Sequence, residues 1–426
     1  MSVAGARATA RAEPRLALFL LSPRIIDFDT FLPTALELKE QRPAWTIRFV
    51  TFSLENHDFI LRNHSMRSAL DGLGTLHYLG SRDTSGWPRR AARKFRTLAL
   101  LALWILGRPR PTLFMSRPFA KMPYSLIYAL ARLRGGRGYL LWKSRSPDQV
   151  HHIVWQNRKP PAVQPRSLIS RLIGRDVDGV IDYHGEQDAN VGLSESFGRI
   201  ADAPKRRIGL PHLFPAWRRF IVAESRRERE RLAADGVPED AELYAMFAAK
   251  PWSSVNLRDD GSVERSFLRA ITVLLRLRPR AVVLIRPHPK ALDEPYIRHA
   301  IEAAGPGRAR LSLAHPEVLL ALARRAIFNN PSNIMFSCLD GRLIDVSDYA
   351  PRHYAEWGEV SLAHGYGPLF VNPRAADFET RLARAIEDDR MFEPIELHRK
   401  RDALLGANPA DLGPLLALVE ADGARP

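Results

Sequence analysis

The chain has 426 residues, of which 46% are apolar and 26% are charged, and this length and composition favour two soluble globular domains. Its formal net charge of +16 favours anionic partners, but the sequence contains no recognisable DNA- or RNA-binding module, so we expect no nucleic-acid partner. The single cysteine, Cys338, excludes an intrachain disulfide and a cysteine-based zinc site, and it is typical of a reducing cytoplasm.

Two apolar stretches bear on secretion and membrane insertion. The first, LALFLL at residues 16–21, is too short for the apolar region of a signal peptide. The longest, LALLALWIL at residues 98–106, is well short of the roughly 20 residues that a membrane-spanning helix needs. We therefore expect a cytoplasmic protein without a transmembrane helix.

Short apolar segments alternate with helical patterns through the first half of the chain. Continuous apolar segments separated by helices are typical of parallel strands covered on both faces of a sheet. Helices are predicted at residues 28–41, 55–71 and 120–134. Strands are predicted at residues 15–22, 46–52, 75–80, 112–116, 139–144 and 179–184.

Residues 87–111 have two interpretations. Five basic residues between positions 89 and 96 precede the apolar run, and Arg108 and Arg110 follow it. The segment is either a buried helix with a solvated basic end, or a helix that lies in a membrane interface with its arginines on anionic head groups. The second interpretation predicts peripheral contact with an anionic membrane.

The second half repeats the same alternation. It opens with a charged helix at residues 220–236, in which SRRERERL (225–232) is predicted to be a solvated face. Further helices are predicted at 262–277, 293–304, 316–325, from Ser332 onward, 376–388 and 409–421. Strands are predicted at 243–249, 281–287, 310–314, 326–330, 342–346 and 368–372.

The predicted fold class is α/β, with two Rossmann-like, doubly wound parallel-sheet domains that face a cleft. We place the N-terminal domain at residues 1–210 and the C-terminal domain at residues 211–426, with the last helices able to pack back on the N-terminal domain. Ligands of such sheets bind beyond the carboxyl ends of the strands. Motifs at strand ends therefore supply the candidate site residues.

The first motif is RPHPK at residues 286–290, which ends the strand predicted at 281–287. Its two prolines restrict the backbone on both sides of His288 and so fix the direction of the imidazole. Arg286 can bind phosphate through two parallel hydrogen bonds, and Lys290 lies in the same turn. The turn is either a phosphate clamp or a simple strand stop.

The second motif is NNPSN at residues 329–333, where a predicted strand gives way to a helix. Asn330 ends the strand, and Ser332 or Asn333 can cap the helix that follows. Backbone N–H groups at a helix start attract phosphate, and a serine hydroxyl adds a further donor. The motif is either a second phosphate site or an ordinary helix cap.

The third motif is VIDYHGEQ at residues 180–187, at the end of the last strand predicted in the N-terminal half. Gly185 allows a sharp bend that leaves the imidazole of His184 at the strand tip. Asp182 and Glu186 can orient or tune this imidazole, or one of the two carboxylates can itself be the base. The alternative is a surface histidine in an ordinary turn.

In this order, the three motifs resemble those of the GT-B-fold transferases of bacterial surface and capsular polysaccharide synthesis. That group includes the Kdo and sialic acid transferases and the CDP-glycerol glycerophosphotransferases. The resemblance covers most of the architecture and is sharpest at residues 281–346. It departs at the helix start, where the family's Ser-Ser or Ser-Thr pair is Ser332-Asn333, and after His184, where GEQDAN replaces the usual continuation.

The resemblance implies a role for each motif. Arg286 and His288 would bind the donor's phosphate with the helix start at Ser332, and His184 would be the acid/base group. It implies a glycosyltransferase that uses a nucleotide-activated sugar, with a CMP-linked donor favoured, and a glycan or lipid-linked glycan as acceptor in capsule or lipopolysaccharide synthesis. The alternatives are a CDP-polyol phosphotransferase, a nucleotide-sugar epimerase, and a non-catalytic nucleotide- or glycan-binding protein.

An inverting transfer needs a base for the acceptor hydroxyl and fixed positive groups that face the leaving phosphate. We expect no metal and no cofactor, because we recognise no Asp-x-Asp metal site like that of the other large glycosyltransferase fold, and because the cationic groups of the motifs can neutralise the leaving phosphate. If residues 87–111 contact lipid, the cytoplasmic enzyme is peripheral on the inner membrane.

Overall fold

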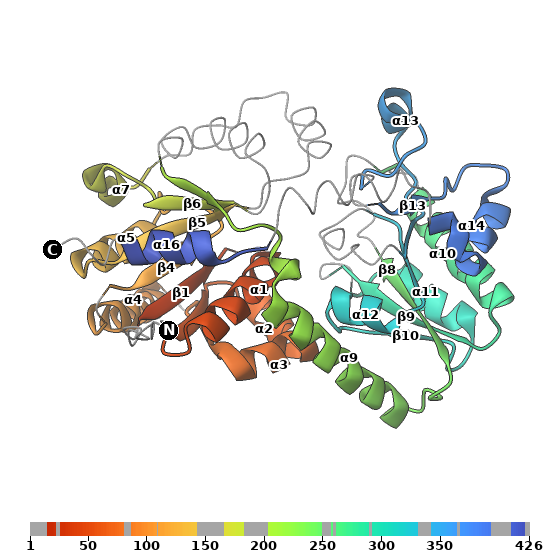
Figure 1. Cartoon of the computed structure of the whole chain (residues 1–426), viewed down its shortest axis with the longest axis horizontal. Helices are drawn as coiled ribbons and strands as arrows, with labels where there is room; N and C mark the ends of the chain where they lie inside the picture. Colours follow the sequence, from red (N-terminus) through yellow and green to blue (C-terminus); the bar gives the residue numbers. More distant parts are fainter. Residues whose placement is uncertain are drawn as a thin grey trace, which may run out of the picture.

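In the residues that the structure describes, the chain forms two parallel β-sheets, each with helices on both faces (Figure 1). This arrangement confirms the predicted α/β fold with two doubly wound sheets. The computed structural model describes residues 15–22, 26–80, 87–108, 110–142, 166–182, 203–248, 257–258, 261–288, 292–330, 342–363, 367–392 and 410–421.

The N-terminal sheet is built from the strands β1 (Leu16–Leu21), β2 (Thr46–Thr51), β3 (Gly74–Tyr78), β4 (Thr112–Met115), β5 (Arg137–Trp142), β6 (Gly179–Asp182) and β7 (Lys205–Arg207). They lie parallel in the order β3-β2-β1-β4-β5-β6-β7, so the winding direction reverses between β1 and β4. The six strands predicted for this half are all present. The three residues of β7 are KRR, a charged sequence without the apolar run that would predict a strand.

The helices that cover this sheet are α1 (Ile26–Gln41), α2 (Leu54–Arg62), α3 (His64–Leu73), α4 (Trp87–Leu106), α5 (Tyr124–Leu133) and α7 (Leu168–Ile173). Phe19 of β1 belongs to the core under α1, α2 and α3, whereas Leu18 and Leu20 belong to the core under α4 and α5. The single helix predicted at 55–71 is two helices. Asn63 interrupts it because its backbone is extended, and its side chain caps α3 by accepting from the Met66 N–H at 3.0 Å.

The C-terminal sheet is built from β8 (Glu242–Ala248), β9 (Ala281–Pro287), β10 (Ala309–Leu311), β11 (Arg325–Phe328), β12 (Leu343–Asp345) and β13 (Leu369–Phe370). Its order, β10-β9-β8-β11-β12-β13, reverses between β8 and β11. The helices α10 (Ser262–Leu277), α11 (Pro295–Ala304) and α14 (Phe378–Glu387) share one core with the sheet, and α12 (Pro316–Leu322) packs in the other. The helix α13 (Pro351–Trp357) and the 3-10 helix η4 (Asp389–Phe392) complete the described elements of this part.

A long helix, α9 (Pro215–Ala234), follows the short 3-10 helix η1 (Pro211–Leu213) and joins the two sheets. It begins at Pro215, five residues before the predicted start, and proline suits the first turn of a helix because no N–H partner is needed there. Along its length α9 packs against α1 and α3 of the N-terminal domain and against α12 of the C-terminal domain.

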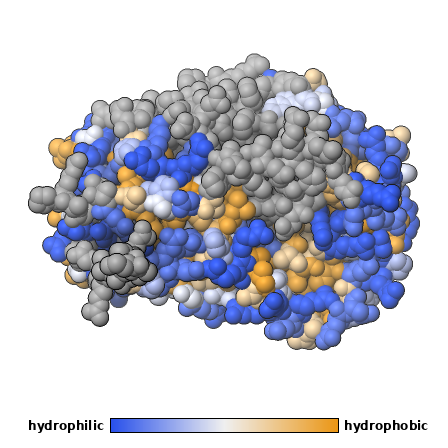
Figure 2. All heavy atoms as spheres, viewed as in Figure 1, coloured by the Kyte–Doolittle hydropathy of each residue, from blue (hydrophilic) through white to orange (hydrophobic). Residues whose placement is uncertain are grey.

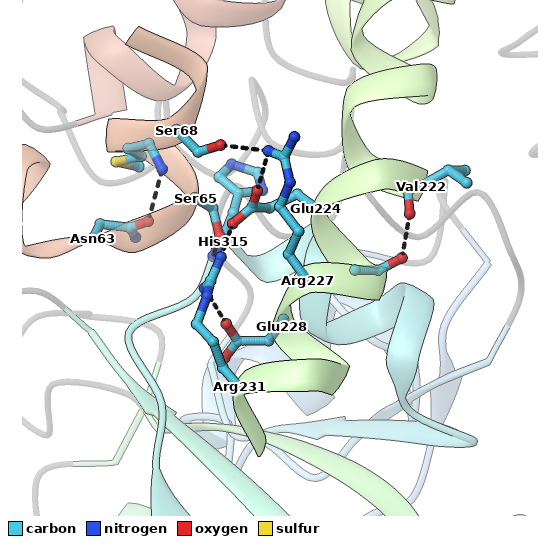
Figure 3. Close-up of polar contacts among 11 residues, drawn as sticks. Asn63, Ser65, Ser68, Val222, Glu224, Arg227, Glu228, Arg231 and His315 are labelled. Atoms are coloured by element: carbon cyan, nitrogen blue, oxygen red, sulfur yellow. Dashed lines mark hydrogen bonds and ion pairs between the residues drawn. The ribbon is translucent and has the colours of Figure 1, made fainter. Parts of the chain in front are cut away.

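The prediction that SRRERERL (225–232) of α9 is a solvated face is confirmed for Arg226, Arg227 and Glu230, which are exposed, and wrong for Glu228, which is buried. Glu224 is fully buried and Glu228 is 8% exposed, because this side of α9 faces α3. The Glu224 carboxylate pairs with Arg227 at 3.2 Å and also with Arg231, and Arg227 donates to the Ser68 hydroxyl of α3 at 2.8 Å (Figure 3). The buried Glu224 thus pairs with arginines of its own helix, and one of them, Arg227, makes an exposed hydrogen bond to the neighbouring helix α3.

The C-terminal helix α16 (Gly413–Ala421) lies against the N-terminal sheet near β7. Leu415 is fully buried in the same core as Phe19, and Arg15 donates to the Val419 carbonyl at 3.1 Å. An exposed ion pair of 2.6 Å joins Arg42 to Glu420. The first and last of the described segments therefore lie on one domain, although most of the second half forms the other.

Helix α4 combines features of both interpretations of residues 87–111. Leu101 and Ile105 are fully buried against the sheet, whereas Phe95 is 76% and Leu103 is 68% exposed. The helix is therefore half-buried, with an apolar outer surface as well as an apolar inner one. In the described parts of the chain, no helix has the length and apolar character required to cross a membrane.

Candidate functional site at the domain junction

The carboxyl ends of the two sheets meet at the junction between the domains. Asp29 lies in the first turn of α1, after β1, and its carboxylate accepts a hydrogen bond of 2.5 Å from His315, which caps α12 after β10. One apolar core continues from Phe19 of the N-terminal sheet to Phe328 of the C-terminal sheet. Figure 2 shows apolar residues gathered between the domains on an otherwise largely hydrophilic face. The switch points of both sheets therefore open toward one interdomain region.

Two of the predicted donor-side motifs lie on either side of β8. Phe247 of β8 has Arg286 of β9 as its neighbour on one side and Phe328 of β11 on the other. His288 follows β9 and is half-buried, and Asn330 follows β11 by two residues. Two strand spacings separate β9 from β11, roughly 10 Å. The structure thus brings Arg286, His288 and Asn330 to the C-terminal switch point.

Arg286 is oriented by buried groups. Its residue is 8% exposed, and its Nε donates to the Ala314 carbonyl at 2.7 Å. Burial lowers the pKa of the guanidinium to about 10, an effect that the nearby Asp29 carboxylate opposes. Arg286 is therefore still a cation at neutral pH, and it is attracted to a carboxylate from the other domain.

Asp29 is the acidic centre of this group. Burial acts to raise the pKa of its carboxyl, but His315, His212 and Arg286 lower it by more, so the pKa is well below its usual range. His315 Nδ1 accepts from the Glu317 N–H at 3.2 Å, which leaves Nε2 as the protonated nitrogen that donates to Asp29. The imidazole thus bridges the helix α12 and the helix α1.

A second polar group ties α12 to the linking segment. The Glu317 carboxylate accepts from Trp217 Nε1 of α9 at 2.8 Å and pairs with His212 Nδ1 of η1. The Trp217 ring packs edge-on against His315 with ring centroids 5.0 Å apart. The backbone N–H of His315 donates to the Ser65 hydroxyl of α3 at 3.2 Å, and Figure 3 shows both residues beside α9. The junction is therefore a fixed interface of buried polar side chains.

The N-terminal switch point carries its own buried carboxylate. Asp27 Oδ2 accepts from the Ser22 N–H at 2.9 Å, at the end of β1, and from the Ser116 hydroxyl at 2.5 Å, at the end of β4. Burial raises the pKa of Tyr124 to about 12, with a further contribution from Asp27. Asp27 thus joins the ends of the two strands between which the sheet reverses.

The predicted acid/base motif is described in part. Asp182 is the last residue of β6 and is 4% exposed. It lies three strands from β1, roughly 14 Å, so it is set apart from the Asp29 and His315 contact. His184 and Glu186 of the same motif, Lys290 of the first motif and Ser332 and Asn333 of the second all lie outside the described residues.

A buried carboxylate also fixes the chain after β12. Asp345 accepts from the Ser347 N–H at 2.8 Å, from the Tyr349 hydroxyl at 2.6 Å and from the Ser361 hydroxyl at 2.5 Å. Burial raises the pKa of Asp345, and these hydrogen bonds oppose the rise. The Leu362 N–H donates in turn to the Tyr349 oxygen at 3.0 Å. Residues 346–363 are thereby held against the carboxyl end of the C-terminal sheet.

Two Asp-x-Asp sequences do occur in the chain, at Asp27–Asp29 and Asp176–Asp178, so the sequence-based statement that nothing resembles such a site overlooked them. In each pair the two carboxylates have different partners: Asp176 pairs with Arg166 at 2.6 Å, and Asp178 accepts from the Gly138 N–H at 2.9 Å. In the described ranges, no group of three or more His, Cys, Asp or Glu side chains is arranged to hold a metal ion.

Sequence reasoning missed Asp27, Asp29 and His315. The two aspartates follow the first apolar strand directly, so the rule that selected Arg286 at a strand end applies to them equally. The pair formed by Asp29 and His315 has no such signal, because the residues are 286 positions apart in the sequence.

Comparisons with known proteins place the chain by fold. No protein-family model matches the sequence, and no curated protein resembles it in sequence. Solved structures do match it over nearly its whole length. One is UGT2 of Phytolacca americana, in complex with UDP-2fluoro-glucose and pterostilbene, with a TM-score of 0.52, 12% identity, 96% of this chain covered and 99% of the other.

A second match is a UDP-N-acetylglucosamine 2-epimerase from Rickettsia bellii, with a TM-score of 0.51, 10% identity, 96% of this chain covered and 98% of the other. These neighbours have the two-domain GT-B architecture, so the chain has the GT-B fold. At these identities the likeness extends to the fold alone.

Proposed function

We propose that the protein is a GT-B transferase that moves a sugar from a nucleotide-activated donor to a glycan or lipid-linked glycan acceptor. The proposal rests on one observation: cationic and polar side chains lie at the strand ends around the C-terminal switch point. Arg286 lies near the end of β9, His288 follows that strand, and Asn330 follows β11. In open α/β sheets this position is where ligands bind.

The donor's phosphates would lie over the ends of β8, β9 and β11. Arg286 and His288 would face them from one side, and Asn330 with the helix start at Ser332 and Asn333 would face them from the other, with Lys290 as a further cation. Fixed positive groups stabilise the charge that grows on the leaving phosphate, so neither a metal nor a cofactor is part of the proposal.

The acceptor's hydroxyl would meet a base from the N-terminal domain. His184, Asp182 and Glu186 are the candidates from the strand-end motif, and Asp27 is a further one because it is buried at the switch point of the N-terminal sheet. With the base in the N-terminal domain and the phosphate ligands in the C-terminal domain, the sugar would be transferred at the junction between the two domains.

A CMP-linked sugar is the donor that the motif order favours, and the pathway would be that of a bacterial capsule or lipopolysaccharide. A UDP-linked sugar is the competing donor, since the Phytolacca americana structure contains UDP-2fluoro-glucose. The Rickettsia bellii structure is that of a nucleotide-sugar epimerase, so epimerisation is the competing reaction. The CDP-polyol phosphotransferase and the non-catalytic binding protein stay as alternatives. Peripheral contact of residues 87–111 with an anionic membrane would bring a lipid-linked acceptor to the cleft.

Product analysis separates these functions. The purified protein is incubated with CMP-sialic acid, CMP-Kdo, UDP-N-acetylglucosamine and CDP-glycerol, each with and without bacterial glycan acceptors. We expect release of free CMP that increases when acceptor is added. Conversion of a UDP-sugar to its epimer without acceptor would identify an epimerase instead. Binding without turnover for every donor would identify a non-catalytic protein.

A further inference from the structure

The positive charge of the chain is concentrated in one stretch. Residues 84–147 contain 14 lysines and arginines and no aspartate or glutamate, while the formal net charge of the whole chain is +16. The described part of this stretch forms α4, β4, α5 and β5, and both of its helices cover the same face of the N-terminal sheet. This one stretch of sequence therefore carries most of the net charge, and the rest of the chain is close to neutral.

Exposed apolar side chains gather on the same layer. Eleven large apolar residues are exposed in the described ranges, and eight of them belong to α4, to α7 or to α5 and the loop before it. Helix α7 packs on α5, and the Ser167 hydroxyl donates to the Ser125 hydroxyl at 2.7 Å. The eight residues are Phe95, Leu100, Leu103, Leu106, Met122, Leu133, Leu168 and Leu172.

A cationic and aromatic group borders this apolar surface. The Arg48 guanidinium of β2 lies 4.2 Å from the centroid of the Trp104 ring of α4, and the His77 ring of β3 lies 4.4 Å from the same indole. The Arg48 pKa is lowered by burial and by the nearby Arg108 cation. Among the described residues, neither arginine has a carboxylate partner. A guanidinium held over an indole ring, with a second cation near enough to lower its pKa, is a group of the kind that attracts phosphate.

We propose that the outer layer formed by α4, α5 and α7 is a docking surface for an anionic lipid bilayer, and that Arg48, Trp104 and Arg108 bind a phosphate-containing head group. Apolar side chains rimmed by arginines fit an interface in which leucine and phenylalanine enter the acyl region and the cations stay at the head groups. A nucleic acid would use the charge but would leave Phe95, Leu103 and Leu133 in water. Positive charge and exposed apolar side chains on the same surface together favour a bilayer as the partner.

This surface extends the proposed membrane contact of residues 87–111 to α5 and α7. Its use in bringing the enzyme to a lipid-linked acceptor rests on the proposed function, but the binding to lipid does not. It lies on the face of the N-terminal sheet opposite α1 and α3, and the described residues of the C-terminal domain pack on the other face. Docking there does not involve the junction. Helix α4 follows β3 along the chain, so it begins on the side of the N-terminal sheet where the strands have their carboxyl ends.

Vesicle flotation tests the surface. The full chain is mixed with vesicles of phosphatidylcholine alone or of phosphatidylcholine with phosphatidylglycerol. We expect binding to the anionic vesicles, weakened by salt, and little binding to the neutral ones. Leu103→Glu should weaken binding by about tenfold or more, because it removes an inserting side chain and adds a negative charge. Arg48→Ala and Arg108→Ala should each weaken it by about fivefold.

The matched control is Leu61→Glu, at an exposed leucine of α2 outside the layer, and it should bind like the wild type. Thermal unfolding establishes that each variant is folded. The proposal is overturned if the protein binds both kinds of vesicle equally or binds neither. It is also overturned if Leu103→Glu and Leu61→Glu weaken vesicle binding equally. Tight binding of a single-stranded RNA that survives Leu103→Glu overturns it as well. Nucleotide binding is measured on the same variants to separate this proposal from the proposed function. A variant that loses vesicle binding but still binds nucleotide reports on the docking surface alone. A protein that binds vesicles but no nucleotide counts against the donor site alone.

Discussion

Asp29, Arg286 and His315 form a buried group of polar side chains that come from both domains. A buried charge is costly unless oppositely charged or hydrogen-bonding groups surround it, and here each domain supplies the partners of the other. The strand-end positions of Arg286 and His288 follow from sequence, because an apolar run stops at them. Their partners do not, because pairing across domains depends on how two sheets pack and not on local pattern.

Asp29→Asn should reduce the free energy of unfolding at neutral pH by about 2 to 3 kcal/mol, because it leaves the Arg286 cation buried without its anionic neighbour. The effect should depend on pH. The pKa of Asp29 is lower in the folded protein than in the unfolded chain, so the ionised carboxylate stabilises the fold above about pH 4. That contribution is lost as the pH falls from there toward the folded-state pKa.

Urea unfolding of the wild type and of Asp29→Asn between pH 7 and pH 3 checks this prediction. The difference in stability should shrink as the pH falls below about 4. Asp71→Asn, at an exposed aspartate of α3, is the matched control and should show little difference at any pH. A difference for Asp29→Asn that stays constant over the whole range contradicts the assignment of an ionised, stabilising carboxylate.

At the scale of elements, apolar runs predict the strands and many helix ends, such as those of α10 at 262–277, because they report burial against a sheet. They do not reveal β7, which is short and charged, or the break at Asn63, which depends on one residue's backbone and cap. The burial of Glu228 on α9 was missed for a related reason: a helix with charged residues on every side gives no sign of which side another helix will cover.

Glu224→Ala should destabilise the protein by about 1 to 2 kcal/mol, because it removes the buried acceptor that Arg227 and Arg231 share at the contact of α9 with α3. The two arginines are 57% and 35% exposed, so they can turn to water, and this keeps the loss below that of a fully buried pair.

The matched control is Glu230→Ala, at an exposed position of the same helix, for which we expect a change within about 0.5 kcal/mol. Thermal unfolding of both variants measures the difference. Equal effects in the two variants would mean that the buried Glu224 carboxylate and its ion pairs add nothing to stability.

At the scale of the whole molecule, the two sheets share a continuous apolar core, which independent domains do not require. One apolar core runs from the N-terminal sheet through α9 to the C-terminal sheet, and α16 returns from the second half to the first. A large apolar interface couples domains, so we expect them to unfold together. The same coupling would make a ligand bound at the junction stabilise the entire chain.

Calorimetric unfolding with CMP, CDP, UMP, UDP, GDP or buffer alone tests the central claim, that a nucleotide donor binds at the carboxyl end of the C-terminal sheet. We predict one transition, and a nucleotide at about 100 times its dissociation constant should add roughly 2.7 kcal/mol to the free energy of unfolding. His288→Ala should abolish the shift while leaving the transition in buffer nearly unchanged. A cytidine response supports the CMP-linked donor, and a uridine response keeps the transferase but changes its donor. No shift with any nucleotide contradicts the account.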